Sequence, residues 1–571
     1  MVDVLYSLVN VNERFDQLIL DHLYICHLNM TTMTIRSVFD RIYSIDDQVL
    51  SRICEQILPR IHHQVNQLTV ESHSMDRLLT VNYSQLYSLS LVDFQEKILL
   101  QYLKVFDRIY SIDDQVLARI CERILPRIHH QVNQLTVEPR SMDRLLTVNY
   151  SQLYSLSLVD FQEKILLQYL KGNSILCNLL SEQITHLYID MEVKTVEPPL
   201  SKTLSKIFVL ILSLCKRLIS LNFCSSCRYR LMAIHIFKPS TTNCISSTLT
   251  TLNFNMDNFA DCLYLLDGRL NCLSTLIIRV LKISPVISNI KNTKKLPELK
   301  SFSLTSSDLT MAYDNLIIPL LHRMINLEEL KLLLSVIRFD STYIDGIQLQ
   351  DEVLIYIPRL NKLTFSIVTL LFNNNIKIDL RSNEEIQRSF IGRVYGQIGS
   401  DVQTLIMKNE GICHVYSLPY QFEDFYHLNN SFQGGIFNKV QCLLMTDQTY
   451  PFEHYFFQVI SQDFPFLKEL YIFNYQPQKD KQHSSTWIRF PYLLLLNLVM
   501  AHMDYVEEFL FDKNIHLPRL LNLSIKYESL AIVTNNFTND AARITCSKLK
   551  CLDISEPFVR PENFHQYFPL L

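Results

Sequence analysis

The chain has 571 residues, of which 48% are hydrophobic and 19% charged, so it carries ample apolar surface for a large core. Its net charge of −4 gives no basic excess for binding nucleic acid or an anionic membrane surface. Only 9 residues are glycine, where average usage of roughly 7% would give about 40. Because phosphate-binding loops need glycine, this composition disfavours a nucleotide-dependent enzyme.

The 14 cysteines are scattered singly, as in proteins whose thiols stay reduced. The longest apolar run, Ile207–Cys215, is far shorter than the roughly 20 residues of a membrane helix. No secretory leader is recognisable at the start of the sequence. We therefore expect a cytoplasmic or nuclear protein that has no membrane segment and no cofactor.

The first segment, residues 1–30, is predicted to form a short helix and then a strand. Its helical part has apolar residues along one face, namely Val4, Leu5, Leu8, Val11, Phe15, Leu18 and Ile19. Ile25, Leu28 and Met30 follow with the spacing Leu-x-x-Leu-x-Leu. The last two of these positions are two residues apart, so they share one face of a strand.

Residues 38–104 and 105–171 are one segment that occurs twice. The copies differ only at Ser51/Ala118, Gln56/Arg123, Ser72/Pro139 and His73/Arg140. Each copy is predicted to hold a helix that starts at a Ser-x-x-Asp capping sequence, followed by two strands with the apolar triplet. A repeat array tolerates insertion of whole units because each unit contacts only its neighbours. The duplication is therefore either a recent lengthening of an array or an error in assembling the gene.

The same triplet, with Ile, Phe, Val or Met as substitutes, recurs along residues 172–571. Its last five copies start 26 to 29 residues apart, at Val440, Leu467, Leu493, Leu520 and Leu549. This is the period of leucine-rich repeats, and the wider or irregular spacing upstream, which includes a triplet at Val402, Leu405 and Met407, predicts loop insertions. Helix-like stretches between triplets often end in proline, as at Phe464-Pro465.

These patterns predict an α/β fold, specifically a leucine-rich-repeat-like solenoid with a curved parallel sheet and outer helices. An ordinary α/β domain with leucine-rich strands is the alternative. Within the array, the insertion with Gly392, Gly396 and Gly399 is expected to be a flexible loop. A second insertion, with Phe422, Phe425 and Tyr426, is expected either to plug the interior or to form a binding lip.

No residue pattern singles out a catalytic, cofactor or metal site, and we expect no enzyme activity. Cys224 and Cys227 have the spacing of a metal-binding pair, but the sequence offers no suitably spaced second pair of ligands. We interpret them as loop thiols. The paired histidines at 62–63 and 129–130 are interpreted as surface or packing residues.

The N-terminal apolar stripe resembles the second half of an F-box, since Val11, Phe15, Leu18 and Ile19 match its Val-x-x-x-Phe-x-x-Leu-Ile signature. With its repeats, the chain is similar to F-box proteins with leucine-rich repeats. In that family the F-box binds the Skp-type linker of a cullin ubiquitin ligase, and the repeats hold a protein substrate. The resemblance implies that the stripe, Val4, Leu5 and Leu8 included, contacts the linker. The family's first half, which begins Leu-Pro-x-Glu-Ile, is absent here, and we expect a longer transcript to supply it.

Residues that alternate with the buried strand positions are expected to face outward, on the concave side of the sheet. They are Glu329, Lys331, Lys362, Glu469, Tyr471, Asn497, Asn522, Lys526 and Asp553. Mixed charge with tyrosine and asparagine suits a protein ligand rather than nucleic acid or membrane, although a solvated face without a partner is also compatible. We therefore predict a substrate receptor of a cullin-type ubiquitin ligase; the alternative is a repeat scaffold that binds a protein without docking on the ligase.

Overall fold

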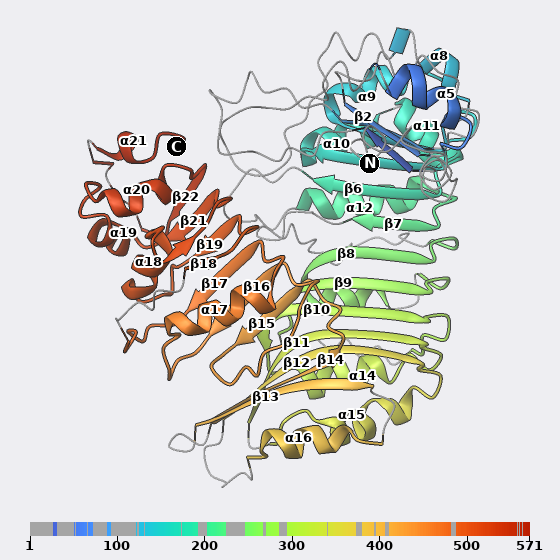
Figure 1. The fold of residues 1–571 in the computed structure, drawn as a ribbon. Coiled ribbons are helices and arrows are strands. Elements are labelled where there is room, and N and C mark those ends of the chain that lie inside the picture. Colours follow the sequence, from blue (N-terminus) through green and yellow to red (C-terminus); the bar gives the residue numbers. More distant parts are fainter. Residues whose placement is uncertain are drawn as a thin grey trace. The chain divides into compact units, whose positions relative to one another are not determined.

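The computed structural model describes most of the chain from residue 121 on and shorter stretches before it. The described residues are 27–30, 51, 53–65, 67–71, 88–92, 121–122, 125–130, 132–172, 174–191, 202–223, 246–266, 270–284, 294–339, 341–372, 380–392, 396–405, 410–480, 487–556, 558, 560–561 and 563–571. The predicted F-box helix and the pair Cys224 and Cys227 lie outside them. The fold is mixed α/β, with strands that pair mostly in parallel (Figure 1).

Two compact units divide the chain, and each is described by itself. The first runs to Asp257 and includes Tyr264–Ile278, and the second contains Asn258–Leu263 and Arg279–Leu571. The strands of the first unit are β1 (His27–Met30), β2 (Gln67–Glu71), β3 (Ser88–Val92), β4 (Gln134–Val137), β5 (Ser155–Phe161), β6 (His186–Met191), β7 (Ser220–Phe223) and β8 (Thr251–Asn258). Strand β9 (Thr275–Lys282) and helix α13 (Phe259–Leu265) cross the division.

Strands β1 to β8 pair in chain order, and every pair is parallel. The register places the middle residue of each apolar triplet beside its counterpart in the next strand. These positions are Leu28, Leu68, Leu89, Leu135, Leu156, Leu187, Leu221 and Leu252. The duplicated segments thus form equivalent strands, β2 and β3 in one copy and β4 and β5 in the other.

Helices connect these strands. They are η1 (Ile53–Ile57), α5 (Leu58–Ile61), α8 (Leu125–Ile128), α9 (Pro139–Leu145), α10 (Glu163–Lys171), α11 (Ile175–Glu182) and α12 (Lys202–Leu214). Pro139, one of the four residues that differ between the copies, occupies the first turn of α9, where its missing N–H costs no hydrogen bond. Leu166 and Leu170 of α10 and Leu176 and Leu180 of α11 are buried, so these helices are amphipathic.

The second unit starts with parallel strands and then reverses direction. Strands β10 (Ser301–Thr310), β11 (Glu329–Phe339) and β12 (Lys362–Phe372) are parallel, but β14 (Glu410–Leu418) is antiparallel to both β12 and β13 (Gln397–Leu405). The prediction of a repeat strand at Val402, Leu405 and Met407 is therefore wrong. Residues 406–409 are too short a connection for the crossover that parallel strands require.

This reversal also corrects the predicted glycine loop. Gly399 lies within β13, opposite Tyr416 of β14, and a Cβ at this position would stand 2.2 Å from the Tyr416 ring. Gly392 and Gly396 have positive φ angles and lie before the strand. The last glycine of the cluster thus makes room for a buried aromatic ring across the strand pair.

A six-stranded parallel sheet follows in the same unit. Its strands are β15 (Asp424–Leu428), β16 (Cys442–Thr446), β17 (Glu469–Phe473), β19 (Leu495–Asn497), β21 (Asn522–Ile525) and β22 (Cys551–Ile554), in that order. Their register aligns Leu443, Leu470, Leu496, Leu523 and Leu552 as one row. Four of these leucines are at most 1% exposed, and Leu552 packs against the same core, so the row forms part of one interior.

Helices cover the leucine side of this sheet. Helix α17 (His454–Asp463) contributes Phe457 and Ile460, and α18 (Met503–Leu510) contributes Tyr505 and Phe509, to the core that the leucines form. The remaining helices are α19 (Tyr527–Val533), α20 (Asp540–Cys546) and α21 (Phe564–Tyr567). On the same side, the two short strands β18 (Ile488–Arg489) and β20 (Ile515–His516) pair in parallel just before Phe490-Pro491 and Leu517-Pro518, where the sequence predicted helix ends.

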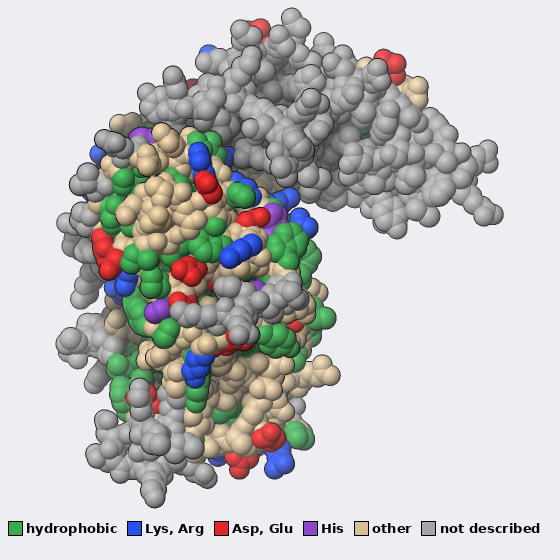
Figure 2. All heavy atoms as spheres, turned by 60° about the vertical axis from the view of Figure 1, so that its left-hand side comes forward, with side chains coloured by type: hydrophobic (Ala, Val, Ile, Leu, Met, Phe, Trp, Pro, Cys, Tyr) green, Lys and Arg blue, Asp and Glu red, His purple; other side chains and the backbone are tan. Residues whose placement is uncertain are grey.

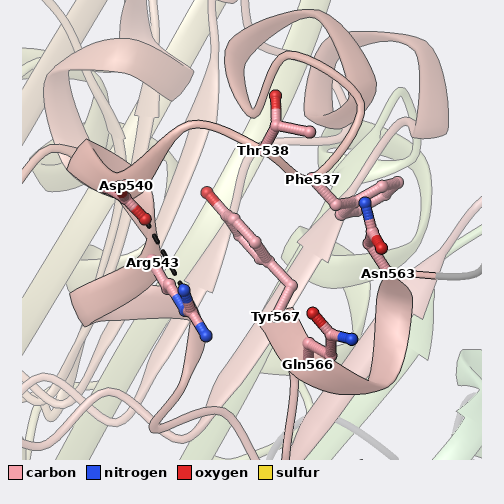
Figure 3. Close-up of a pocket in the computed structure, with 7 residues that line it drawn as sticks. All are labelled: Phe537, Thr538, Asp540, Arg543, Asn563, Gln566 and Tyr567. Carbon is pink, nitrogen blue, oxygen red and sulfur yellow. Dashed lines mark ion pairs between the residues drawn. The ribbon is translucent and has the colours of Figure 1, made fainter.

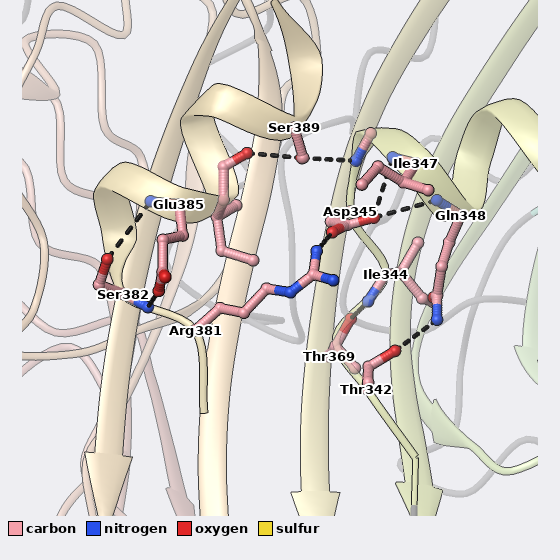
Figure 4. A network of polar contacts seen from close by, with 12 residues as sticks. Thr342, Ile344, Asp345, Ile347, Gln348, Thr369, Arg381, Ser382, Glu385 and Ser389 are labelled. Carbon is pink, nitrogen blue, oxygen red and sulfur yellow. Dashed lines mark hydrogen bonds and ion pairs between the residues drawn. The ribbon is translucent and has the colours of Figure 1, made fainter. Parts of the chain in front are cut away.

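The turns between β11 and β13 are held by buried polar residues (Figure 4). Helix α15 (Gly346–Glu352) starts at Asp345, whose carboxylate accepts hydrogen bonds from Ile347 N at 2.9 Å and Gln348 N at 3.0 Å. Arg381, just before α16 (Asn383–Phe390), forms an ion pair with the same carboxylate. The unit also contains η3 (Tyr313–Ile317), α14 (Ile318–Leu321) and η4 (Leu354–Tyr356).

Gly346 has no room for a side chain, and this gives a first prediction. A Cβ at Gly346 would lie 2.4 Å from the Ser389 carbonyl oxygen, while its N–H donates to Ser389 Oγ at 2.9 Å. Gly346→Ala is expected to destabilise the second unit by about 1–3 kcal/mol, because backbone must move to admit the methyl group. Gly172→Ala is the matched control, since its nearest contact would be an ordinary 3.5 Å. Thermal unfolding followed by circular dichroism measures the melting temperatures of both variants. Equal melting temperatures would contradict the conclusion that Gly346 has no room for a side chain.

Candidate functional site

The outward face of the six-stranded sheet is the side opposite the leucine row. One row of side chains on this face consists of Tyr471 and the residues that pair with it in register across five strands. They are Leu444, Tyr471, Asn497, Ser524 and Asp553. Asp553 is exposed, and Tyr471 and Asn497 are half-buried. Asn497 Oδ1 accepts a hydrogen bond from Val499 N at 3.1 Å, so this side chain also fixes the turn after its strand.

The second outward row lies two residues earlier and is less open. It comprises Cys442, Glu469, Leu495, Asn522 and Cys551. Glu469 is only 8% exposed, which corrects the expectation that it faces solvent. Strand alternation predicts which side of the sheet a residue occupies, but not whether that side is covered there. Asn522 is half-buried and stays at the surface.

An exposed aromatic cluster marks the carboxyl ends of these strands. Tyr475 is 55% exposed, its hydroxyl lies 3.0 Å from Met500 Sδ, and Lys526 Nζ lies 5.6 Å from its ring centre. Phe473 and Tyr450 are 38% and 49% exposed. Tyr450 is anchored through its carbonyl oxygen, which accepts from Asn474 Nδ2 at 2.7 Å. Lys526, a predicted partner-binding residue, therefore belongs to a surface of large apolar groups that the sequence pattern did not identify.

The remaining predicted residues form a separate group on β11 and β12. Glu329 and Lys362 are neighbours in register, and Glu329 Oε1 lies 2.8 Å from Lys362 Nζ and 3.3 Å from Lys331 Nζ. The hydrogen bond from Lys362 and the nearby charge of Lys331 lower the pKa of the Glu329 carboxyl. The three side chains thus largely satisfy one another, and the structure does not join them to the six-stranded sheet's outward residues.

The start of the six-stranded sheet is closed by polar and aromatic packing. Asp424 of β15, 4% exposed in its side chain, forms an ion pair of 2.9 Å with Arg279 of β9. Phe425 is fully buried between Phe437 and Phe464, and Tyr426 is 9% exposed. The expectation that this aromatic insertion plugs the interior is therefore confirmed for Phe425, and neither Phe425 nor Tyr426 forms an exposed lip.

Buried titratable groups lie beneath this plug. His414 of β14 is 3% exposed and contacts Ser366 Oγ through Nε2 at 2.9 Å. Burial, with the nearby His427, lowers its pKa to about 3. Opposite His414 on β13, Asp401 accepts hydrogen bonds from Gln433 N at 3.0 Å and Tyr416 Oη at 3.2 Å. Burial raises the pKa of Asp401 to about 6. These groups tie strands to loops.

A small pocket of about 180 Å³ lies between α20 and α21 (Figure 3). Asp540 and Arg543 line it from α20, and Gln566 and Tyr567 line it from α21. Tyr567 Oη donates to Asn539 O at 2.8 Å, and Arg543 lies 3.6 Å from Asp540. The pocket is smaller than the roughly 300 Å³ at which small-molecule sites usually start. We therefore place the candidate site on the outward sheet face and its aromatic carboxyl edge.

The composition of the surface agrees with this choice. On the face seen in Figure 2, hydrophobic side chains alternate with single charged groups of both signs, and no block of one charge stands out among the described residues. Within the described ranges, no group of three or more His, Cys, Asp or Glu side chains is placed to hold a metal ion. No helix in those ranges has the length and apolar character needed to cross a membrane.

Comparison with known proteins does not assign the chain to a family. No protein-family model matches it, and a search of curated proteins found no match. The arguments about its role therefore rest on its own residues and geometry.

Proposed function

We propose that the chain is a leucine-rich-repeat solenoid that binds another protein on the outward face of its second unit. The observation that carries this proposal is the in-register row of Leu443, Leu470, Leu496, Leu523 and Leu552. Parallel strands in chain order at a spacing of 26 to 29 residues, with α17 and α18 packed on the leucine side, are typical of such repeats. The helices occupy the leucine side, so we place the ligand on the other side, where Asp553 is exposed and Tyr471 and Asn497 are half-buried.

The chemistry of this face favours a protein as the ligand. Tyr471, Phe473, Tyr475 and Met500 supply large side chains that bury much area at low entropic cost, and aromatic residues and methionine are enriched in protein interfaces. Asn497 and Asp553 supply polar groups beside them. Isolated apolar residues on a surface need no explanation, but Phe473 and Tyr475 are exposed at the end of β17, and the Tyr475 hydroxyl contacts the exposed Met500 after β19, so large side chains gather there.

The N-terminal resemblance gives this binding role a context. If residues 1–30 complete an F-box, the chain is the substrate receptor of a cullin-type ubiquitin ligase, with the repeat array holding the substrate. Val11, Phe15, Leu18 and Ile19 support this proposal by their match to the second F-box signature. If they do not bind a Skp-type linker, the chain is a scaffold that binds its partner without docking on a ligase.

Affinity capture with two variants separates these roles. The tagged protein, expressed from the longest transcript, is expected to co-purify a Skp-type linker, a cullin and a substrate protein. Tyr471→Ala combined with Tyr475→Ala should reduce substrate recovery at least about tenfold, because two anchors are lost, while the linker is retained. Phe15→Asp should do the reverse, since it places a charge in the linker-binding stripe.

The outcome is decided by mass spectrometry and by binding of the purified linker. Tyr455→Ala, which removes a 71% exposed tyrosine from α17 on the helix side of the sheet, serves as the control for the double variant. A substrate that is captured equally by the double variant rules out the outward face. A linker that binds neither the long nor the short product leaves the scaffold role and removes the ligase role.

A further inference from the structure

The amino edge of the six-stranded sheet carries a second surface, distinct from the outward face. Five adjacent strands of the sheet are each preceded by a residue in an equivalent place, three positions before the first residue that pairs with the next strand. These residues are Lys439, Phe466, Tyr492, Arg519 and Lys548. Lys439, Phe466, Tyr492 and Arg519 are exposed and Lys548 is half-buried. Each precedes a buried leucine or valine of the core, so its backbone position is fixed by the repeat.

Contacts between neighbouring side chains join the middle of this row into a ladder. The rings of Phe466 and Tyr492 lie 5.7 Å apart at an angle of 37°, and Arg519 Cζ lies 5.2 Å from the centre of the Tyr492 ring. Phe466 comes from the repeat that contains β17, Tyr492 from the repeat that contains β19 and Arg519 from the repeat that contains β21. Tyr492 is thus held between an aromatic ring and a guanidinium group.

A parallel row adds further positive charge. Main-chain hydrogen bonds run from Lys468 N to Gln441 O, from Leu494 N to Lys468 O and from Lys550 N to Leu521 O, which places Lys468 and Lys550 in the row next to the ladder. Together the two rows on β16 to β22 hold five basic residues and no acidic one, in a chain whose net charge is −4. Glu423, the residue just before the adjoining strand β15, is the acidic group at the end of the second row.

We propose that this basic edge, defined by Lys439, Phe466, Lys468, Tyr492, Arg519 and Lys548, binds an acidic segment of a partner protein. This inference rests on the proposed protein-binding role and adds to it the chemistry of the segment that is bound. A guanidinium group can offer two N–H groups to one carboxylate, and Arg519 Cζ stays 5.2 Å from the centre of the Tyr492 ring. Neighbouring strands lie about 4.8 Å apart, so the row from Lys439 to Lys548 matches an extended segment of about six residues.

Aromatic geometry favours a peptide over a nucleic acid. Single-stranded nucleic acids bind basic grooves by stacking bases on open ring faces. Here the two sides of Tyr492 along the row are occupied by Phe466 and Arg519. The ring edges that remain exposed carry partial positive charge, which suits carboxylates and the apolar side chains between them.

Fluorescence anisotropy with a defined probe tests the inference. The purified full chain is titrated into a fluorescein-labelled peptide of about twelve residues in which Glu and Asp alternate with Leu and Phe. Binding that weakens as salt rises is expected. Lys468→Glu combined with Arg519→Glu should weaken it at least about tenfold, because two attractions become repulsions. Lys479→Glu combined with Lys513→Glu, which changes the net charge equally at exposed residues off the edge, should change it less than about twofold.

Further measurements distinguish peptide binding at the basic edge from binding at the outward face and from nucleic-acid binding. Tyr471→Ala with Tyr475→Ala should bind the peptide as the natural chain does, so a failure of the outward face and a failure of the basic edge are distinguishable. Equal affinities of the edge variant and its control would overturn the inference. It is also overturned if an oligothymidylate of equal charge binds more tightly than the peptide and loses its affinity in the edge variant, or if the peptide does not bind at millimolar concentration.

Discussion

Replacing Leu496 by alanine is expected to lower the free energy of unfolding of the second unit by about 2–5 kcal/mol. Leu496 is fully buried and lies between Leu470 and Leu523 in the leucine row. The substitution removes three buried carbons and leaves a cavity that the rigid strands on either side cannot close. In a stack where each repeat is covered only by its neighbours, the loss also weakens the contacts of the adjoining repeats.

Urea unfolding followed by the fluorescence of Trp487 measures this effect. Trp487 is the single tryptophan of the chain and stacks on His516 with ring centres 5.0 Å apart, on the helix side of the same sheet. Asn497→Ala is the matched control, since it changes the next residue on the outward face and should cost no more than about 1 kcal/mol. A loss below about 1 kcal/mol for Leu496→Ala would mean that the row does not form one shared core.

The regular part of the fold followed from the sequence because its repeat sets register. From residue 440 on, one apolar triplet per 26 to 29 residues marks both the strand and the face that is buried, and the structure has strands with buried leucines at these places. The pattern failed at Val402, where a short connection forces an antiparallel pair although the apolar spacing is the same. Apolar periodicity states which side of a strand is buried, and the length of the connection decides its direction.

The sequence predicted the residues of the binding face less well than it predicted the repeats. Alternation placed Tyr471, Asn497 and Asp553 on the outward face, but Glu469 on the same face is buried. The aromatic carboxyl edge draws residues from turns, which the apolar pattern does not describe, whereas the residues of the basic edge recur with the repeat itself. A signal for the basic edge does exist, because Phe466, Tyr492 and Arg519 all stand between a proline and a core leucine.

Arg338 shows that a charged residue can occupy a buried strand position for which the sequence pattern predicts an apolar side chain. It occupies an inward position on β11, where the pattern predicts an apolar residue, and its side chain is 4% exposed. The guanidinium group pairs with Asp314 at 2.5 Å and donates to the Thr342 carbonyl oxygen at 3.1 Å. Asp314 belongs to η3 before the strand and Thr342 to the connection after it, so the apolar pattern of the strand does not reveal them. A buried charge of this kind is tolerated only because its partners are also brought in by the fold.

Acid is expected to destabilise the second unit from about pH 6.5 downward, with His414 as a main cause. The pKa of His414 is lowered to about 3 by burial and by His427, whereas the unfolded chain takes up a proton near pH 6.5. The unfolded state therefore binds more protons than the folded state in this window. The folded state loses about 1.4 kcal/mol of stability per pH unit, up to about 5 kcal/mol near pH 3. His427, with a pKa lowered to about 4 by burial, acts in the same direction.

Asp401 has the opposite sign and supplies an internal test. Its pKa is raised to about 6, above the ordinary value of 3.8, so the folded state binds the extra proton between these values. This group alone gains stability as the pH falls from about 6 to 4, by up to about 3 kcal/mol. Asp401→Asn should therefore make the acid loss steeper, whereas His414→Gln, which keeps a polar group for Ser366 Oγ, should make it shallower.

Urea titrations of the natural chain and both variants at pH 7, 6 and 5 decide between these contributions. The natural chain should lose stability over this range, because two histidines oppose one carboxyl group. The two variants must deviate from it in opposite directions, which a general weakening of the fold does not produce. If both variants follow the natural pH profile, the buried cluster of His414, His427 and Asp401 does not set the acid response, and carboxylates elsewhere in the unit do.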